Sequence, residues 1–183
     1  MIFLIYVFLA NGFEEIEAIT TIDILRRASI DTCVVGVNQK LIKGAYGVNI
    51  ETDILSEDVD FDNMEGIILT GGLPGVNNLS KDFIVKKAIE HCFLNKKLIA
   101  AICAAPTILG KLGILQGKVA TCYPGFEKKL LGATVYSDSV CLSDNILTAK
   151  GPGVALQFSL KIVETLKGKK LCDSLIEDLQ MTY

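Results

Sequence analysis

Residues 98–106 read Leu98-Ile99-Ala100-Ala101-Ile102-Cys103-Ala104-Ala105-Pro106. The first five are apolar and have the length of a buried strand, whereas the small residues and the proline that follow suit a tight turn into a helix. Cys103 stands at that turn. A buried strand that leads directly into a helix predicts an α/β fold with a parallel sheet covered on both faces.

The same alternation runs along the rest of the chain. Strands are expected at residues 2–8, 32–37, 66–70, 98–102, 119–122, 134–136, 140–143 and 146–149, and helices at 14–28, 82–95, 104–112, 153–166 and 170–179. Residues 41–51 contain two glycines and predict an irregular hairpin. Because no repeat or flexible linker interrupts the pattern, residues 1–183 are expected to form one domain.

The composition excludes several classes of partner. Charged residues make up 21% of the chain, the net charge is −3, and the lysine pairs are scattered, so no nucleic-acid surface is expected. The mean hydropathy is +0.43. The most apolar stretch, residues 98–115, is nevertheless broken by a proline and two glycines, and the run at residues 2–10 lacks the basic flank and cleavage site of a signal peptide. The sequence therefore predicts a cytoplasmic protein with no membrane partner.

The cysteines and the single histidine limit the chemistry. Six cysteines without C-x-x-C spacing indicate reduced thiols, and with one histidine they predict no metal site. The cysteines other than Cys103 stand at positions 33, 92, 122, 141 and 172 and are expected to fill the core. His91 falls in mid-helix on the side away from the strand ends, so it is interpreted as structural and a Cys–His catalytic pair is not expected.

Three loops are expected to meet where the ligand sites of such folds lie, outside the carboxyl ends of the strands. They are residues 11–17, 71–75 and 103–105. Backbone N–H groups at the helix start would lower the pKa of the Cys103 thiol and make it reactive. The alternative is an inert buried cysteine, and position alone does not decide between the two.

An acidic group begins the first helix, at Glu14, Glu15 and Glu17. Such residues are common at helix starts because they favour the helix dipole. Glu17, however, falls on a different face from the other two and could point toward the strand ends. Burial beside a thiolate would raise the pKa of its carboxyl, which could then donate a hydrogen bond to the sulfur and shuttle a proton.

Residues of two further loops could border the same cleft. The pair Gly71-Gly72 follows a strand and could offer backbone N–H groups to an oxyanion, although an ordinary turn explains it equally well. It is not a dinucleotide-binding fingerprint, because the G-x-G-x-x-G spacing is absent. Tyr123 follows a short strand, and Cys122 before it is either a second redox thiol or, as we prefer, a packed strand residue.

Four stretches in this order resemble the ThiJ/PfpI family, within it the branch of the parkinsonism-associated protein deglycase and its bacterial relatives. They are Asn11-Gly12-Phe13-Glu14-Glu15-Ile16-Glu17-Ala18, Leu69-Thr70-Gly71-Gly72, Leu98-Ile99-Ala100-Ala101-Ile102-Cys103-Ala104-Ala105-Pro106-Thr107, and Leu147-Thr148-Ala149-Lys150-Gly151-Pro152-Gly153. The resemblance spans essentially the whole chain. It implies a flavodoxin-like three-layer sandwich of the class I glutamine amidotransferase-like type, and a homodimer.

The resemblance also implies roles for individual residues. Cys103 would be the nucleophile, Glu17 its carboxyl partner, and the backbone of Gly72 and Ala104 the oxyanion donors. The implied activities need no cofactor: glyoxalase-type hydration of methylglyoxal to lactate, deglycation, chaperoning, and oxidant sensing by cysteine oxidation. Two hypotheses follow, an enzyme that acts on small dicarbonyls and a redox-sensing or chaperone-like protein, and both use the same thiol.

Two departures from the family pattern refine this expectation. The protease-like branch carries a histidine directly after the cysteine, and here that position is Ala104, so a peptidase is disfavoured. The deglycase branch often has a histidine near the cleft after the next strand, where this chain has Cys122-Tyr123-Pro124. The proton shuttle is therefore left to Glu17.

Overall fold

A computed structural model describes residues 4–181. Its centre is a seven-stranded sheet in the order β10-β11-β7-β6-β1-β2-β5. The strands of the sheet are β1 (Leu4–Leu9), β2 (Thr32–Gly36), β5 (Ile54–Leu55), β6 (Met64–Leu69), β7 (Leu98–Ile102), β10 (Val140–Ser143) and β11 (Ile146–Ala149). All neighbours pair in parallel except β10 and β11, which form an antiparallel hairpin at one edge. The predicted α/β fold with a mostly parallel sheet is confirmed.

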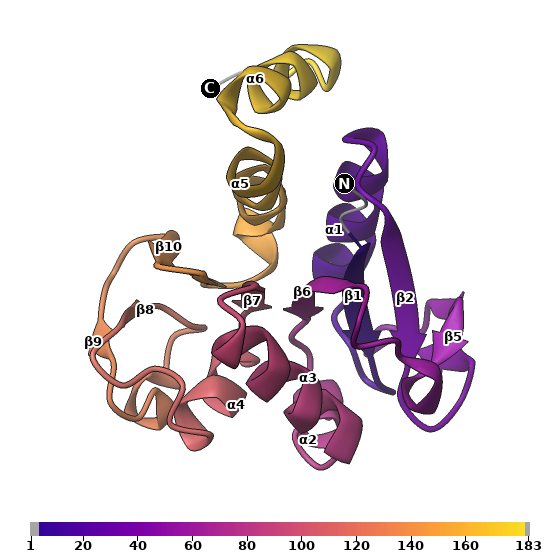
Figure 1. Cartoon of the computed structure of the whole chain (residues 1–183), viewed down its shortest axis with the longest axis vertical. Coiled ribbons are helices and arrows are strands. Elements are labelled where there is room, and N and C mark those ends of the chain that lie inside the picture. Colours follow the sequence, from indigo (N-terminus) through magenta and orange to yellow (C-terminus); the bar gives the residue numbers. More distant parts are fainter. Residues whose placement is uncertain (1–3, 182–183) are drawn as a thin grey trace.

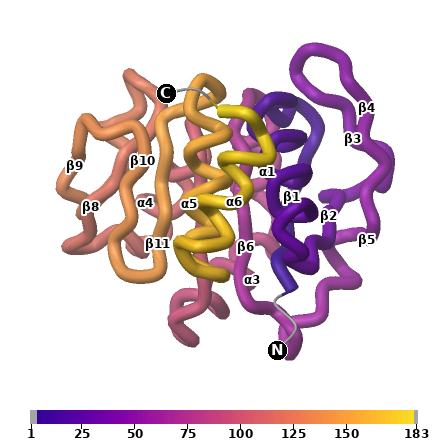
Figure 2. The backbone as a smooth tube through the Cα atoms, turned by 90° about the horizontal axis from the view of Figure 1, so that it is seen from above, coloured from indigo at the N-terminus to yellow at the C-terminus, as the bar shows by residue number. Residues whose placement is uncertain are grey.

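Helices cover both faces of this sheet, which gives three layers (Figure 1). The helices are α1 (Glu15–Arg27), α2 (Gly75–Leu79), α3 (Phe83–Leu94), α4 (Pro106–Lys111), α5 (Ala155–Lys167) and α6 (Lys169–Asp178), with short 3₁₀ helices η1 (Ser56–Asp58), η2 (Glu127–Lys129) and η3 (Pro152–Val154). α1, α5 and α6 lie on one face and α2, α3 and α4 on the other. Viewed from above, α1, α5 and α6 cross the middle of the sheet (Figure 2).

Two small sheets extend the core at opposite ends. β3 (Leu41–Lys43) and β4 (Asn49–Glu51) form an antiparallel hairpin, and β8 (Val119–Ala120) pairs in parallel with β9 (Thr134–Val135). The hairpin predicted within residues 41–51 is therefore confirmed. In Figure 2 these two additions flank the main sheet on either side.

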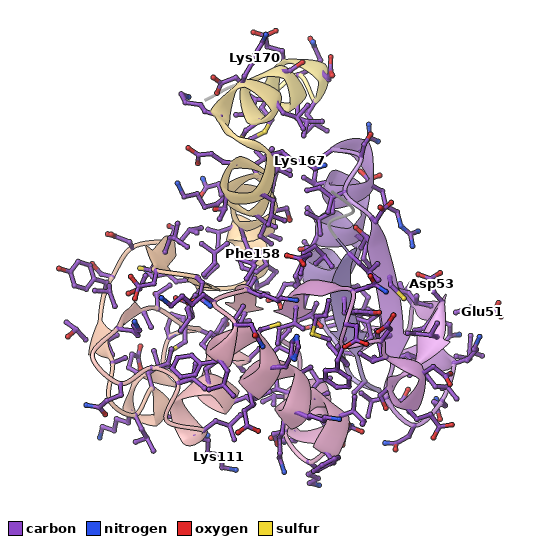
Figure 3. All side chains as sticks on the ribbon, in the orientation of Figure 1. Glu51, Asp53, Lys111, Phe158, Lys167 and Lys170 are labelled. Carbon is purple, nitrogen blue, oxygen red and sulfur yellow. The ribbon has the colours of Figure 1, made fainter. Side chains whose placement is uncertain are left out.

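The central strands are apolar throughout because each of them is buried on both faces. In β1, Tyr6 and Phe8 pack in the core on the face of α2, α3 and α4, whereas Ile5 and Val7 pack against the helices of the opposite face. Phe158 of α5, labelled in Figure 3, is fully buried against that second face. Burying one such aromatic side chain stabilises the fold by about 2–3 kcal/mol, so the two faces hold the sheet and its loops firmly in place.

Several predicted boundaries need correction. The first strand begins at Leu4 among the described residues, and Ile2 lies outside them. The predicted helix at 104–112 begins only at Pro106, because Cys103 takes a left-handed backbone conformation that ends the strand without starting a helix. The predicted strand at 119–122 is shorter, ending at Ala120. The two-residue strand β5 and the five-residue helix α2 were not expected, since neither is long enough to show a periodicity.

The register of the central strands brings the three predicted loops together. Leu69 of β6 pairs with Phe8 of β1 on one side and with Ala101 of β7 on the other. The carboxyl ends of these strands are thus level with one another, and residues 11–17, 71–75 and 103–105 emerge side by side. This edge of the sheet holds the candidate site.

Candidate active site

The backbone of Cys103 adopts a conformation that L-residues rarely take, with φ = +66°. Hydrogen bonds on both sides hold it there: its N–H donates to the Ala149 carbonyl at 2.9 Å, and its carbonyl accepts from the Tyr123 N–H at 2.9 Å. Such a conformation costs about 1–3 kcal/mol and persists only where the surroundings impose it, often at functional sites. The turn places the Cys103 side chain just beyond the carboxyl end of β7.

The partly exposed Cys103 side chain lines a pocket of about 330 Å³. Residues from six segments of the chain contribute to the walls: Glu14, Ala45, Tyr46, Gly72, Leu73, Cys103, Ala104, Tyr123, Phe126 and Pro152. A volume of this size suits a small molecule. Glu14 is the only Asp, Glu, Lys or Arg among the described lining residues, and the other large side chains are apolar or aromatic.

Glu17 lies directly behind Cys103 and is fully buried. The Gly71 N–H donates to its Oε2 at 2.7 Å, while its Oε1 has no hydrogen-bond partner among the described residues. Burial raises the pKa of this carboxyl to about 7, against the opposing effect of the interactions with the Gly71 N–H and the Cys103 thiol. The predicted rise in the pKa of Glu17 is confirmed, and at neutral pH the group can both accept and release a proton.

The pKa of the Cys103 thiol is raised, to about 12, and not lowered as the sequence predicted. Burial contributes most, followed by the negative charge of Glu17 and by its side-chain interaction with the thiol. The backbone N–H groups of Gly72 and Ala104 act in the opposite direction but do not outweigh these effects. With Glu17 ionised, the thiol therefore keeps its proton, and it can react as a thiolate when that proton passes to the carboxyl.

Two consecutive glycines allow this close arrangement. A Cβ at Gly71 would lie 2.5 Å from the Cys103 Cβ and 2.6 Å from Glu17 Oε2, so no other residue fits between them. Gly71 is buried beneath the site and does not line the pocket, which corrects the predicted role. Gly72 does line it, at φ = +90°, and its N–H faces the sulfur together with that of Ala104; their role as oxyanion donors stays a prediction.

The predicted cleft residue Tyr123 lines the pocket beside Phe126, which the sequence did not single out. Their ring centroids lie 6.5 Å apart at an interplanar angle of 74°, an edge-to-face contact that fixes this wall. Cys122, in contrast, points into the core, and burial raises the pKa of its thiol to about 11. The interpretation of Cys122 as a packed residue agrees with this position.

Glu14 and Glu15, at the start of α1, have more specific structural roles than the general preference of acidic residues for helix starts. Glu14 Oε2 accepts the N–H of Glu17 at 2.8 Å and so caps α1. Glu15 Oε1 accepts the N–H of Tyr46 at 2.7 Å and that of Val48 at 3.4 Å, which fixes the tip of the β3–β4 hairpin over the pocket. A carboxylate that directly precedes a helix could have indicated the cap, but no local signal places Tyr46 in the site.

The remaining sulfur and imidazole groups lie outside the pocket. His91 packs edge-on against Phe61 with centroids 5.6 Å apart, and burial lowers the pKa of its imidazole. It does not line the pocket, in agreement with a structural role. Cys33 is partly exposed, so its expected place in the core is corrected, whereas Cys92, Cys141 and Cys172 are buried. Among residues 4–181 no group of three or more His, Cys, Asp or Glu side chains could hold a metal ion.

Comparison with known proteins gives the family of the chain. The family model described as "DJ-1/PfpI family" matches residues 4–165. The chain belongs to the DJ-1/PfpI family. It is 38% identical to the protein dj-1beta of Drosophila melanogaster over 180 residues, which cover 97% of this chain and 96% of that protein.

Other relatives extend the likeness. A Caenorhabditis elegans member, named glutathione-independent glyoxalase DJR-1.2, is 37% identical over 167 residues, which cover 91% of this chain and 89% of that protein. The solved structure described as "Toxoplasma gondii DJ-1, oxidized" superimposes with a TM-score of 0.94 at 32% identity and covers 99% of this chain and all of that one. The fold is that of the DJ-1 proteins. No helix within residues 4–181 has the length and apolar character needed to cross a bilayer.

Proposed function

We propose that this DJ-1/PfpI protein is a cysteine-dependent glyoxalase with related deglycase activity. It acts on methylglyoxal-type dicarbonyls or their adducts and thereby protects the cytoplasm from carbonyl and oxidative stress. The observation that carries the proposal is the pairing of Cys103 with a buried Glu17 whose pKa is about 7. A relative that is named a glyoxalase adds support at 37% identity.

The first step joins the substrate to the sulfur. The thiol proton of Cys103 passes to the Glu17 carboxylate as the sulfur adds to the aldehyde carbon, and the N–H groups of Gly72 and Ala104 stabilise the developing oxyanion. Glu17 then returns the proton to this oxygen, which gives a neutral hemithioacetal. Because the transfer accompanies the attack, the raised pKa of the thiol does not prevent it.

The second step moves a hydrogen between neighbouring carbons. The Glu17 carboxylate removes the proton from the sulfur-bearing carbon and delivers it to the former ketone carbon, while the hydroxyl proton moves between the two oxygens. The product is a hydroxyacid thioester of Cys103. Water then cleaves the thioester, which releases lactate and restores the thiol. The sum is methylglyoxal plus water to lactate.

The pocket favours substrates of this kind. Among its described lining residues the charged side chain is the carboxyl of Glu14, and burial raises the pKa of that group. An anionic substrate would find no lysine or arginine there to bind it, whereas a neutral aldehyde can rest against Leu73, Tyr123 and Phe126. Small uncharged dicarbonyls are therefore preferred over oxoacids.

A second function, oxidant sensing, uses the same thiol. The partial exposure of Cys103 favours it, since four of the other five cysteines are buried. Peroxide would oxidise the sulfur to a sulfenate and then a sulfinate, each step releasing water, and protonated Glu17 would donate a hydrogen bond to the product. Intact-mass and peptide analysis after graded peroxide should show oxidation at Cys103 first. Oxidation spread evenly over all six cysteines contradicts a sensor.

Lactate formation by the purified protein tests the catalytic proposal. The wild type should produce lactate from methylglyoxal, and Cys103→Ala and Glu17→Ala should each lose at least about 100-fold in rate. Cys122→Ala is the matched control, because it removes a thiol of the same chain outside the pocket, and it should retain the wild-type rate. If the wild type, Cys103→Ala and Glu17→Ala all match the background rate, the proposal is wrong.

A further inference from the structure

A second pocket lies behind the active site, on the face of the sheet covered by α2 and α4. It has a volume of about 360 Å³. Its lining comes from α2, α4 and η2 and the residues next to them: Val76, Asn77, Ser80, Thr107, Ile108, Lys111, Lys128, Lys129 and Leu131. None of these residues lines the active-site pocket. Nothing in the proposed reaction uses them.

The charge of this pocket is entirely of one sign. Lys111, Lys128 and Lys129 line it, and its described lining contains no aspartate or glutamate. None of the three lysines forms an ion pair with another described residue of the chain. Lys111 lies at the end of α4, at the lower edge of Figure 3. Three ammonium groups brought together in a chain of net charge −3 form a local cationic site.

The pocket lining also contains polar side chains, and two of them already donate their hydrogen bonds within the protein. The Ser80 hydroxyl donates to the Asn77 carbonyl at 2.8 Å, and the Thr107 hydroxyl donates to the Ala104 carbonyl at 2.7 Å. Their hydrogens are thus already engaged. The Asn77 side-chain amide has no hydrogen bond to another described residue and remains free to donate. The side-chain donors available to a ligand are therefore the three ammonium groups and this amide.

From this arrangement we propose that the pocket binds a small phosphomonoester. Three lysines in one lining attract a dianionic phosphate more strongly than a singly charged carboxylate, and lysine is a common phosphate ligand in proteins. The apolar wall of Val76, Ile108 and Leu131 provides space for an uncharged carbon body beside the phosphate. The volume lies at the small end of ligand pockets, which fits a compact metabolite and not a polymer.

The pocket also borders the active site. The Lys129 ammonium lies 4.8 Å above the centroid of the Phe126 ring, and Phe126 also lines the active-site pocket. The cation–π contact holds the ammonium at the wall between the two pockets. The phosphomonoester site is nonetheless separate from Cys103, and the proposal does not depend on the glyoxalase reaction.

Isothermal titration calorimetry with glycerol 3-phosphate tests the proposal, with glycerol as the uncharged counterpart. The wild type should bind the phosphate ester and not glycerol. The variant Lys111→Gln/Lys128→Gln/Lys129→Gln should bind about tenfold more weakly or worse, because three charge-assisted contacts are lost. Lys128→Gln alone should give an intermediate loss, which guards against a folding defect in the triple variant. Cys103→Ala should bind as the wild type does.

A charge-matched variant distinguishes binding at this pocket from general electrostatic attraction of the phosphate ester to the protein. Lys43→Gln/Lys86→Gln/Lys170→Gln removes three exposed lysines elsewhere and should keep the wild-type affinity. Equal weakening in both triple variants, or no binding to the wild type, would overturn the proposal. So would loss of binding in Cys103→Ala, which places the ligand in the active-site pocket. Tighter binding of a single-stranded oligonucleotide through the same lysines would replace the proposal with a polyanion surface.

Discussion

At the scale of single residues, the chemistry depends on where one proton lies between the Cys103 sulfur and the Glu17 carboxyl. Burial raises the pKa of both groups, since neither is easily ionised away from water. The carboxyl, with a pKa of about 7, is the group of the pair that titrates near neutrality. This is why we propose Glu17 as the proton acceptor that makes Cys103 reactive.

The burial of Glu17 has a cost in stability that depends on pH. The pKa of its carboxyl is about 7 in the folded protein against an ordinary value of 4.5, so the folded state holds the proton more tightly. Relative to high pH, the tighter binding of this proton stabilises the folded protein. That stabilisation is fully present below pH 4.5 and is lost as the pH rises through 7. Glu17→Gln keeps an acceptor for the Gly71 N–H but carries no charge.

The free energy of unfolding of Glu17→Gln, relative to the wild type, should therefore increase by roughly 2–3 kcal/mol between pH 5 and pH 8.5. Urea unfolding of both proteins at the two pH values measures the difference. Parallel stability curves across this range would show that the carboxyl is not perturbed in the folded protein.

Part of this residue-level picture is visible in the sequence. Position alone left Cys103 open between a reactive and an inert thiol, the separate face of Glu17 suggested its direction, and the family resemblance implied the pair. The sign of the shift in the thiol pKa was predicted wrongly, because helix-start N–H groups were weighed without the burial and the carboxylate behind the sulfur. Tyr46 was not predicted, since its place depends on a hydrogen bond to Glu15, 31 positions away.

At the scale of elements, the start of α1 serves both stability and the site. Glu14 caps the helix through the backbone N–H of Glu17, and the same carboxyl group faces the pocket. The cap fixes the first turn of α1, and with it the direction of the Glu17 side chain.

Two matched cap variants separate these roles. Asp82 caps α3 in the same way, accepting the Val85 N–H at 2.9 Å, but it lies outside the active-site pocket. Glu14→Ala and Asp82→Ala should each lower the free energy of unfolding by about 1 kcal/mol. Only Glu14→Ala should also slow lactate formation. Equal activity of the two variants would show that the first turn of α1 does not position Glu17.

The long elements could be predicted because the helices bury one face and the central strands bury both, so their apolar residues follow a regular pattern. α1 was expected at residues 14–28 and spans Glu15–Arg27, and β7 has the expected bounds. The short elements α2 and β5 could not be recognised, since five and two residues show no period. They form because tertiary contacts hold them, not because of local preference.

At the scale of the whole molecule, α1 carries exposed apolar side chains on the face away from the sheet. Ile16 is 55% exposed and Ile19 is 44% exposed, next to a surface pocket that Ile19, Ile22 and Ile50 line. Large side chains of this kind on one helix are typical of an interface. They support the prediction of a homodimer that the family resemblance implies.

Sedimentation equilibrium should therefore give a mass of two chains for the wild type, against 19.8 kDa for one. Ile16→Glu/Ile19→Glu should sediment as a single chain, because burying two carboxylates at the interface costs more than the contact contributes. Phe83→Glu, which changes an exposed residue of α3 on the opposite face, should remain a dimer. A single-chain wild type would contradict the prediction.

The proposed function depends above all on a Cys103–Glu17 proton pair that converts dicarbonyls. The most direct test is the pH dependence of kcat/KM for lactate formation from methylglyoxal between pH 5.5 and 8.5. We expect a rate that rises about tenfold per pH unit below an apparent pKa near 7 and then levels off, because ionised Glu17 must accept the thiol proton. A profile that is flat across this range, or a Cys103→Ala variant with the wild-type rate at every pH, would contradict it.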